Sequence, residues 1–218
     1  VAQDPRITTI VLGEGEHKID GNLNSYMALE ISSAINIVGD KGVPKSEIVV
    51  VGGIMFDKGI PGNCHLEHLT LRQAKYHGVA GWSSFTMEDV LVEQCGSCGV
   101  LAWGPDVVCR FTNVEVRQCG QSGVYASYVA SITLIGAKTT VHHNCTKGEE
   151  GEYGLHVAWH RSTLQLVAPL TKEQVATDNG GGGNWGAKYG GDFNQIKTIE
   201  TAAISSSSAH VGETKSIH

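Results

Sequence analysis

The chain has few charged residues, no long apolar run and too few cysteines for a disulfide-stapled scaffold. Asp, Glu, Lys and Arg make up 17% of its 218 residues, against about a quarter in typical globular domains. No apolar run reaches the roughly 18 residues that suggest a membrane-spanning helix, so we expect no membrane span. The net charge of -6 argues against a nucleic-acid partner, which requires a basic surface to neutralise phosphates.

The six cysteines leave the redox state open. They lie at positions 64, 95, 98, 109, 119 and 145. Their even number permits bridges, while buried free thiols are the simpler interpretation. No signal peptide is recognisable, and the first residues resemble the middle of a domain, so we expect a trimmed piece of a longer protein. The compartment stays undetermined, with an extracellular, cell-surface or virion setting favoured.

Glycine is the abundant residue, with 28 of 218 positions, about twice its usual share. The glycines lack the every-third-residue period of collagen. Runs of Ala, Leu, Glu and Lys are scarce, which disfavours a helical bundle. Glycine together with many β-branched residues indicates short strands joined by tight turns.

A repeated pattern organises the middle of the chain. Each copy has an alternating apolar and polar segment, a short turn, and a second short strand that begins after a glycine. Three copies cover residues 66–74 with 78–82, 87–95 with 99–103, and 111–119 with 123–127. A fourth copy covers 139–145 and, after an inserted loop at 147–153, continues at 154–157, and a fifth starts at 164.

The repeat length of 21–25 residues is too short for a unit to bury its own apolar face. Stacking successive units into a solenoid buries these faces. Equivalent residues then lie about 4.8 Å apart in parallel, in-register strands. Because no segment has helical periodicity, a leucine-rich repeat is disfavoured, and the pattern predicts a parallel β-helix.

The order of segments upstream of the repeats is similar to that of a known superfamily. A first strand leads into Leu12-Gly13-Glu14-Gly15-Glu16-His17, and Ile35-Asn36-Ile37-Val38-Gly39-Asp40 precedes the repeats. Over residues 7–200 this resembles the right-handed parallel β-helix superfamily that includes pectin and pectate lyases. The resemblance implies an all-β, single-stranded right-handed parallel β-helix, a solenoid of about 7–8 coils. We expect this domain to cover residues 1–204, followed by a disordered or loosely held Ser-rich tail at 205–218.

Alternation assigns side chains to the two faces of the first strand in each copy. The residues expected to point inward are Leu69, Leu71, Val90, Val92, Val114 and Val116. One outward column contains Arg72, Glu93, Arg117 and, in the fourth copy, His142. This column has two interpretations, namely cross-strand charge pairing or a polar groove for an acidic or hydroxylated glycan.

An enzyme of the resembled superfamily would abstract a proton next to a carboxylate, which requires a base and positive charge. Arg117, His142, Tyr125 and Lys138 are the catalytic candidates for such a polysaccharide lyase or epimerase. The calcium-binding aspartate cluster and the N-T-D, D-D, G-H-G and D-P-H motifs of the family are absent, so we lean against an enzyme. We expect no cofactor, and calcium is an option only if the protein is a lyase. His142, His143 and Cys145 lack the second ligand pair of a zinc site, so no metal site is predicted.

The second strand of each copy points to an aromatic surface. Val79, Val100, Val124 and Leu155 are expected inside, and Ala80, Leu101, Tyr125 and His156 outside. Trp82 and Trp103 occupy equivalent positions, with Tyr125, Tyr128 and Trp159 beside them. Such a strip would stack on sugar rings, and the alternative is that loops or a neighbouring chain cover it. The predicted ligand-binding residues are therefore Trp82, Trp103, Tyr125, Arg72, Glu93 and Arg117.

The turns between the strands carry columns of like residues. Cys95, Cys119 and Asn144 align at one turn, where they form either a packing and hydrogen-bonding ladder or, for the two cysteines, a disulfide bridge. Gln73, Gln94 and Gln118 predict an amide ladder beside them. The recurrent glycines are expected to turn a corner of each coil, at Gly78, Gly99, Gly123 and Gly154.

Three functions follow from these features and remain open. The first is a structural or carbohydrate-binding β-helix module without catalytic motifs. The second is a polysaccharide lyase or epimerase acting on acidic glycans, and the third is an architectural protein-interaction repeat. The expected partner is a polysaccharide or a protein surface, and an oligomer is compatible with all three.

Overall fold

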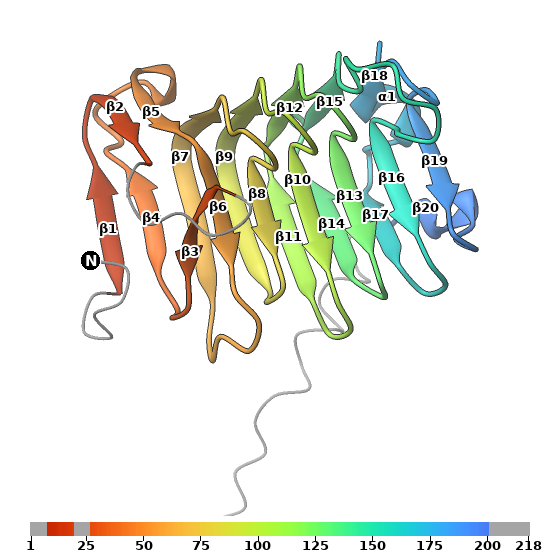
Figure 1. The fold of residues 1–218 in the computed structure, drawn as a ribbon, viewed down its shortest axis with the longest axis horizontal. Helices are drawn as coiled ribbons and strands as arrows, with labels where there is room; N and C mark the ends of the chain where they lie inside the picture. The colour runs from red at the N-terminus through yellow and green to blue at the C-terminus, as the bar shows by residue number, and fades with distance from the viewer. Residues whose placement is uncertain (1–7, 20–26, 201–218) are drawn as a thin grey trace, which may run out of the picture.

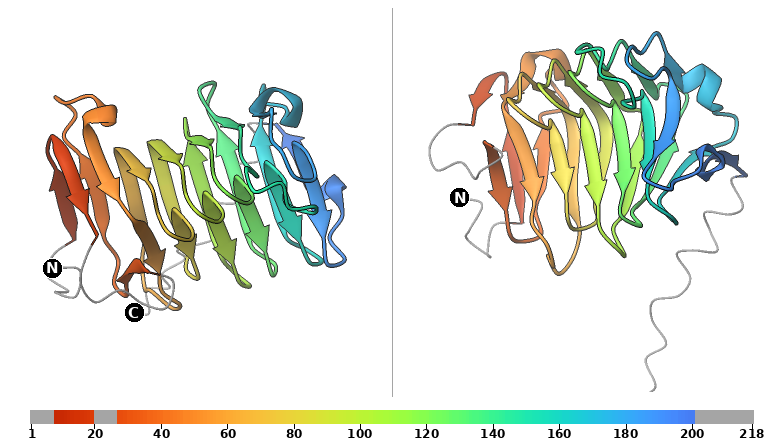
Figure 2. Two further views of the ribbon diagram at one scale, coloured as in Figure 1. Left: turned by 45° about the horizontal axis from the view of Figure 1, so that its top comes forward. Right: turned by 45° about the vertical axis from the view of Figure 1, so that its right-hand side comes forward.

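The computed structural model describes residues 8–19 and 27–200, and within them the regular secondary structure is almost entirely short parallel strands. Every strand pairing in these ranges is parallel. The strands of each sheet follow one another along the long axis in chain order (Figure 1 and Figure 2). The predicted boundary near residue 204 and the tail at 205–218 lie outside the described residues.

The strands form one 13-stranded and one 7-stranded sheet. The larger sheet contains β1 (Thr9–Leu12), β2 (Gly15–Lys18), β4 (Asn36–Gly39), β5 (Ile48–Val51), β7 (Cys64–Arg72), β9 (Phe85–Glu93), β11 (Val108–Thr112), β12 (Glu115–Arg117), β14 (Ser131–Ile135), β15 (Thr140–His142), β17 (Thr163–Val167), β18 (Ala176–Thr177) and β20 (Ile196–Ile199). The smaller sheet contains β3 (Ala28–Ile31), β6 (Gly53–Phe56), β8 (Val79–Gly81), β10 (Val100–Trp103), β13 (Val124–Ser127), β16 (Leu155–Ala158) and β19 (Trp185–Lys188). Three single-turn helices complete the described part, η1 (Lys45–Glu47), α1 (Lys172–Val175) and η2 (Phe193–Gln195). The all-β parallel prediction is confirmed.

The strand register confirms the alignment of the repeats. In the larger sheet Glu93 pairs with both Arg72 and Arg117. In the smaller sheet Val79, Val100, Val124 and Leu155 pair in sequence. Each copy therefore contributes strands to both sheets, and side chains one repeat apart become neighbours in space.

The apolar core lies on the inner faces of the two sheets, as alternation predicts. All six first-strand positions predicted to point inward are fully buried, namely Leu69, Leu71, Val90, Val92, Val114 and Val116. Phe85 packs between Phe56 and Phe111, with ring centroids 5.1 and 5.3 Å away. In-register stacking thus places like side chains on top of each other and gives one continuous core.

The corners of the repeat use left-handed backbone at residues other than glycine. Gln94, Gln118 and His143 have φ values of 55°, 56° and 54°, and a second column with Asp89 and Asn113 has values of 51° and 53°. These residues end or bend the strands of the larger sheet. Because their short polar side chains hydrogen-bond to the nearby backbone, Asn and Asp tolerate this conformation better than most residues. The Gln corners stand instead in a column in which Gln94 donates to Gln118 at 3.4 Å.

The recurrent glycines serve a different purpose from the predicted one. Gly78, Gly99, Gly123 and Gly154 are not among the positions with positive φ. A Cβ at Gly99 would stand 2.3 Å from Cγ1 of Val116, and one at Gly123 would stand 2.4 Å from Cγ1 of Val141. These positions exclude side chains because the chain runs against the next repeat there, which corrects the expectation that they turn the corners.

The predicted turn column is an asparagine ladder continued by cysteines. Asn144 donates from Nδ2 to the Val116 carbonyl and accepts from the Cys119 amide, at 3.0 and 3.1 Å. Asn179 repeats this arrangement one repeat later, where its Oδ1 accepts from the Asn144 amide at 3.0 Å. All six cysteines are buried and free, so the ladder interpretation holds and the bridge between Cys95 and Cys119 does not form. Burial raises the pKa of the Cys109 thiol to about 12.

Candidate functional site

Five aromatic side chains follow the strands of the smaller sheet at the point where each strand ends. Trp82 comes directly after β8 and Trp103 ends β10, while the other three come directly after β13, β16 and β19. We call this set the aromatic ladder: Trp82, Trp103, Tyr128, Trp159 and Tyr189. The Trp82 and Trp103 rings are stacked with centroids 6.4 Å apart, and those of Trp159 and Tyr189 with centroids 5.5 Å apart. Tyr128 continues from Trp103 at 6.1 Å.

The ladder is exposed and is held by unusual backbone geometry. Trp103, Tyr128, Trp159 and Tyr189 are 42% to 58% exposed, which is high for large apolar side chains. Tyr128, Trp159 and Tyr189 have φ values of 54°, 69° and 52°. Left-handed backbone is uncommon for bulky residues, and such strain is concentrated at functional sites. The strip predicted from Trp82 and Trp103 is therefore present, and it extends over further strands.

The outward column of the second strands is buried, contrary to expectation. Ala80, Leu101 and His156 point away from the core but are only 4%, 5% and 1% exposed. Tyr125 is half-buried and stacks on His156 with ring centroids 4.2 Å apart. Burial raises the pKa of Tyr125. This column is thus a second packing layer under the ladder and not an open surface.

Glu152 and Tyr153, from the inserted loop at 147–153, cover part of this buried column. Ser122 donates its hydroxyl proton to Glu152 Oε2 at 2.6 Å, and its oxygen lies 2.8 Å from Nδ1 of His156. Tyr153 contacts His156 edge-on, with ring centroids 5.2 Å apart. Burial alone would raise the pKa of Glu152, but the nearby His156, 3.7 Å away, and the hydrogen bond from Ser122 outweigh it and hold that pKa below its usual value.

The Glu152 contact predicts a pH-dependent contribution to stability. Because the pKa of Glu152 is lowered in the fold, its carboxylate stabilises the fold above the unfolded value of about 4.3. We expect the wild type to be more stable than Glu152→Gln at neutral pH, and the difference to vanish as the pH falls through the folded-state pKa. Urea unfolding of both proteins at several pH values measures this. The exposed Glu173→Gln is the control, and a difference independent of pH would contradict the prediction.

The charged column of the larger sheet consists of paired side chains. Arg117 donates from Nε and Nη2 to Glu93 Oε2 at 2.9 and 2.7 Å, and from Nη1 to Glu115 Oε1 at 2.9 Å. Arg72 donates to Glu16. The Glu93 hydrogen bond raises the pKa of Arg117 further. The geometry therefore fits the cross-strand pairing interpretation, since the carboxylates of the protein itself already occupy the Arg117 guanidinium.

The four catalytic candidates do not meet at one place. Arg117 and His142 are neighbours on β12 and β15, and His142 Nε2 lies 3.3 Å from Glu115 Oε1. Tyr125 belongs to β13 in the other sheet, and Lys138 is exposed in the turn before β15. Within residues 8–19 and 27–200, no group of three or more His, Cys, Asp or Glu side chains is arranged to hold a metal ion. In the same ranges no helix is long and apolar enough to cross a membrane.

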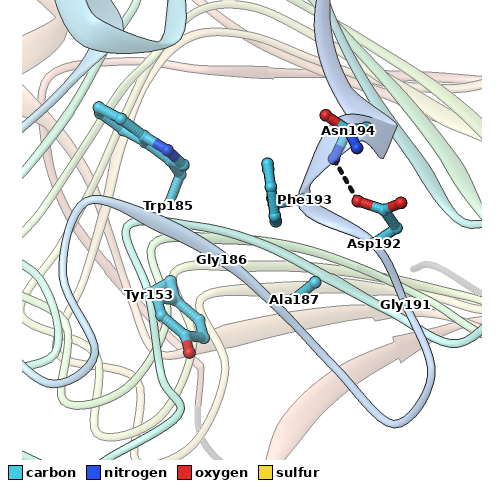
Figure 3. A pocket seen from close by; sticks show the side chains of 8 residues that line it. All are labelled: Tyr153, Trp185, Gly186, Ala187, Gly191, Asp192, Phe193 and Asn194. Carbon is cyan, nitrogen blue, oxygen red and sulfur yellow. Dashed lines mark hydrogen bonds between the residues drawn. The ribbon is translucent and has the colours of Figure 1, made fainter.

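Two hollows lie beside the smaller sheet, one next to its middle strands and one at β19. One has a volume of about 480 Å³ and contains Trp82, the first ring of the ladder, in its wall. The other has a volume of about 780 Å³ and lies at β19, with Trp185 and Phe193 on either side and Asp192 accepting a hydrogen bond from the Asn194 amide (Figure 3). Lys172 stands 5.2 Å over the Trp185 ring. Trp185 packs against the core, and β19 is the terminal strand of the smaller sheet within the described residues.

Tyr189, which the sequence analysis missed, could have been found from the sequence. Tyr189 stands five residues after Asn184, as Tyr128 and Trp159 stand five residues after Gly123 and Gly154. This spacing therefore predicts the last three residues of the ladder, whereas Trp82 and Trp103 stand four residues after Gly78 and Gly99. The packing of Glu152 and Tyr153 against His156 could not be predicted from the repeat, because the loop that carries them has no equivalent in the other copies.

Comparison with known proteins does not add a family to this description. No model of a protein family, no curated protein and no solved structure matches the chain.

Proposed function

We propose that this protein is a carbohydrate-binding module in which an extended sugar chain lies along the aromatic ladder. The observation that carries the proposal is the ladder itself, with large exposed rings on successive strands of one sheet. Aromatic faces provide large apolar area and stack on the flat faces of sugar rings. An exposed strip of this kind marks a binding surface in a soluble protein.

The charge distribution supports a binding module over an enzyme on acidic glycans. Such an enzyme requires a free base and free positive charge near one place. The Arg117 guanidinium binds Glu93 and Glu115, and Tyr125 lies in the other sheet from Arg117 and His142. The ladder needs none of these groups, so binding is the function that fits the arrangement best.

We infer that the two sheets belong to a right-handed parallel β-helix of about 7–8 coils, similar to the pectin-lyase superfamily. In-register parallel pairing of strands one repeat apart and the Asn144–Asn179 ladder support this assignment. A crystal structure tests the handedness and the number of coils, and a left-handed winding would contradict the assignment.

A glycan panel separates the three candidate functions. The panel contains cellohexaose, laminarihexaose, chitohexaose and mannohexaose as neutral probes, and polygalacturonate and alginate as acidic ones. Binding of a neutral chain without product formation supports the proposal. Appearance of unsaturated products or epimerised sugar from an acidic polymer would instead establish the lyase or epimerase. Absence of binding to any probe, together with self-association in light scattering, would favour the architectural repeat.

Trp103→Ala tests the ladder directly. Removing one stacked ring costs about 1.4 kcal/mol of binding free energy, so we expect a dissociation constant roughly tenfold higher for the neutral chain. Tyr76→Ala is the matched control, because Tyr76 is also 42% exposed but lies between β7 and β8, outside the ladder. Isothermal titration calorimetry measures both. Equal affinities for Trp103→Ala and Tyr76→Ala would exclude the ladder as the binding surface.

A further inference from the structure

The hollow beside Trp82 is built by connecting segments from three successive repeats. One wall is the loop between β6 and β7, residues 57–63, and the other is the turn of Pro105 and Asp106 after β10. Trp82 and the two serines that follow it stand between these walls. The volume of about 480 Å³ is within the range of roughly 300–1,000 Å³ that small-molecule sites occupy.

The two serines after Trp82 form hydrogen bonds to both walls of the hollow. Ser83, which is buried, donates to the Asp57 carbonyl at 2.6 Å and accepts from the Ile60 amide at 3.0 Å. Ser84 accepts from the Val108 amide at 2.9 Å, which holds the turn on the other side. The strand exit that presents the Trp82 ring therefore also fixes both loops around it. A site prepared in this way loses less entropy on binding than a flexible one.

The aromatic ladder stops at this hollow. Phe56 pairs with Gly81, so the position of Trp82 is occupied by Asp57 in the preceding repeat. The loop that begins there extends beyond the ends of the neighbouring strands (Figure 1). A sugar chain that lies on the ladder would meet this loop, and its last unit would stand beside Trp82.

Two charged side chains line the hollow with opposite signs. Lys58 comes from one wall and Asp106 from the other, and both are exposed. Among the described residues neither forms an ion pair. A carboxylate accepts hydrogen bonds from sugar hydroxyls and an ammonium group donates to them. Since the two charges balance, an uncharged sugar fits the hollow better than a uronate does.

From these contacts we propose that the hollow binds the terminal unit of an uncharged sugar chain whose following units stack on the ladder. This proposal rests on the proposed function and adds to it the ligand class and a fixed position for the chain end. Trp82 packs against the ring of the terminal unit, and Asp106 and Lys58 bind its hydroxyl groups. The protein then binds chain ends and not the interior of a long polymer.

The stoichiometry of binding tests the position of the chain end. The probes are the neutral hexaose that binds in the panel above and the long soluble polymer of the same linkage. Titration calorimetry and light scattering with the full chain should give one bound protein per sugar chain for both lengths. If the number of bound proteins grows with polymer length, the ladder binds internal segments and the terminal site is excluded.

Asp106→Asn tests the polar contacts. We expect about tenfold weaker binding of the hexaose, because the amide replaces one hydroxyl acceptor while tolerating the φ of 65°. Asp178→Asn is the matched control, since Asp178 is also exposed and has a φ of 53° but follows β18 in the other sheet. Unchanged affinity for Asp106→Asn, with weaker binding by Trp103→Ala, would overturn the terminal site and leave the carbohydrate-binding function in place. No binding of any neutral chain by the wild type would overturn both.

Discussion

Gly99→Ala is expected to destabilise the fold by about 3 kcal/mol, a large effect for one added methyl group. The new Cβ would stand 2.3 Å from Cγ1 of Val116 and 2.9 Å from the carbonyl oxygen of Gly123. Val116 is fully buried, and the Gly123 carbonyl already accepts a hydrogen bond from the Val100 amide at 2.9 Å. Because neither neighbour has free space to move into, the neighbouring repeats must separate locally.

Urea unfolding followed by circular dichroism measures this loss. Gly13→Ala is the matched control, because Gly13 is exposed and a Cβ there meets nothing within 4 Å. Its free energy of unfolding should stay within about 0.5 kcal/mol of the wild type. If Gly99→Ala unfolds at the same urea concentration as Gly13→Ala, the close approach of repeats at this position is not real.

The repeat period made the fold predictable from the sequence. Leu71, Val92 and Val116 recur at matching positions, and parallel in-register stacking is the arrangement that buries all of them. The same logic found the column of Arg72, Glu93 and Arg117. It succeeded because each column is a local consequence of strand alternation within one sheet.

The sequence did not predict where left-handed backbone occurs. Glycine is the usual residue for that conformation, so Gly99 and its equivalents were the natural candidates for the corners. The structure places the corners at Gln94, Gln118 and His143 instead. A column of stacked side chains can stabilise a corner that an isolated residue would not form. These contacts connect different repeats, so the sequence of a single repeat does not reveal them.

The candidate site was predicted in part, for a similar reason. Trp82 and Trp103 were found because they are equivalent positions of one strand column. Tyr125 was grouped with Arg117 and His142, although it belongs to the other sheet. Alternation identifies neighbours within a sheet but does not determine which residues of different sheets meet. The burial of His156 depends on Glu152 and Tyr153 from a loop that occurs in one repeat only.

The asparagine ladder gives the second large prediction, because Asn144 is 1% exposed and joins two repeats. Asn144→Ala removes the acceptor of the Cys119 amide and the donor to the Val116 carbonyl. An unsatisfied buried backbone group costs about 1–3 kcal/mol. We therefore expect the free energy of unfolding to fall by about 3 kcal/mol. Chemical unfolding of the full chain measures it.

The cysteines in the same column supply a graded test of this explanation. Cys95 and Cys119 occupy equivalent positions, and each Sγ donates to a carbonyl two residues earlier at 3.4 Å. A thiol is a weaker hydrogen-bonding group than an amide, so Asn144→Cys should lose about half as much free energy as Asn144→Ala. Asn194→Ala is the control for the loss of an asparagine at an exposed position. Its free energy of unfolding should stay close to that of the wild type. If Asn144→Cys and Asn144→Ala are equally unstable, the ladder acts through shape alone and hydrogen bonding does not connect the repeats.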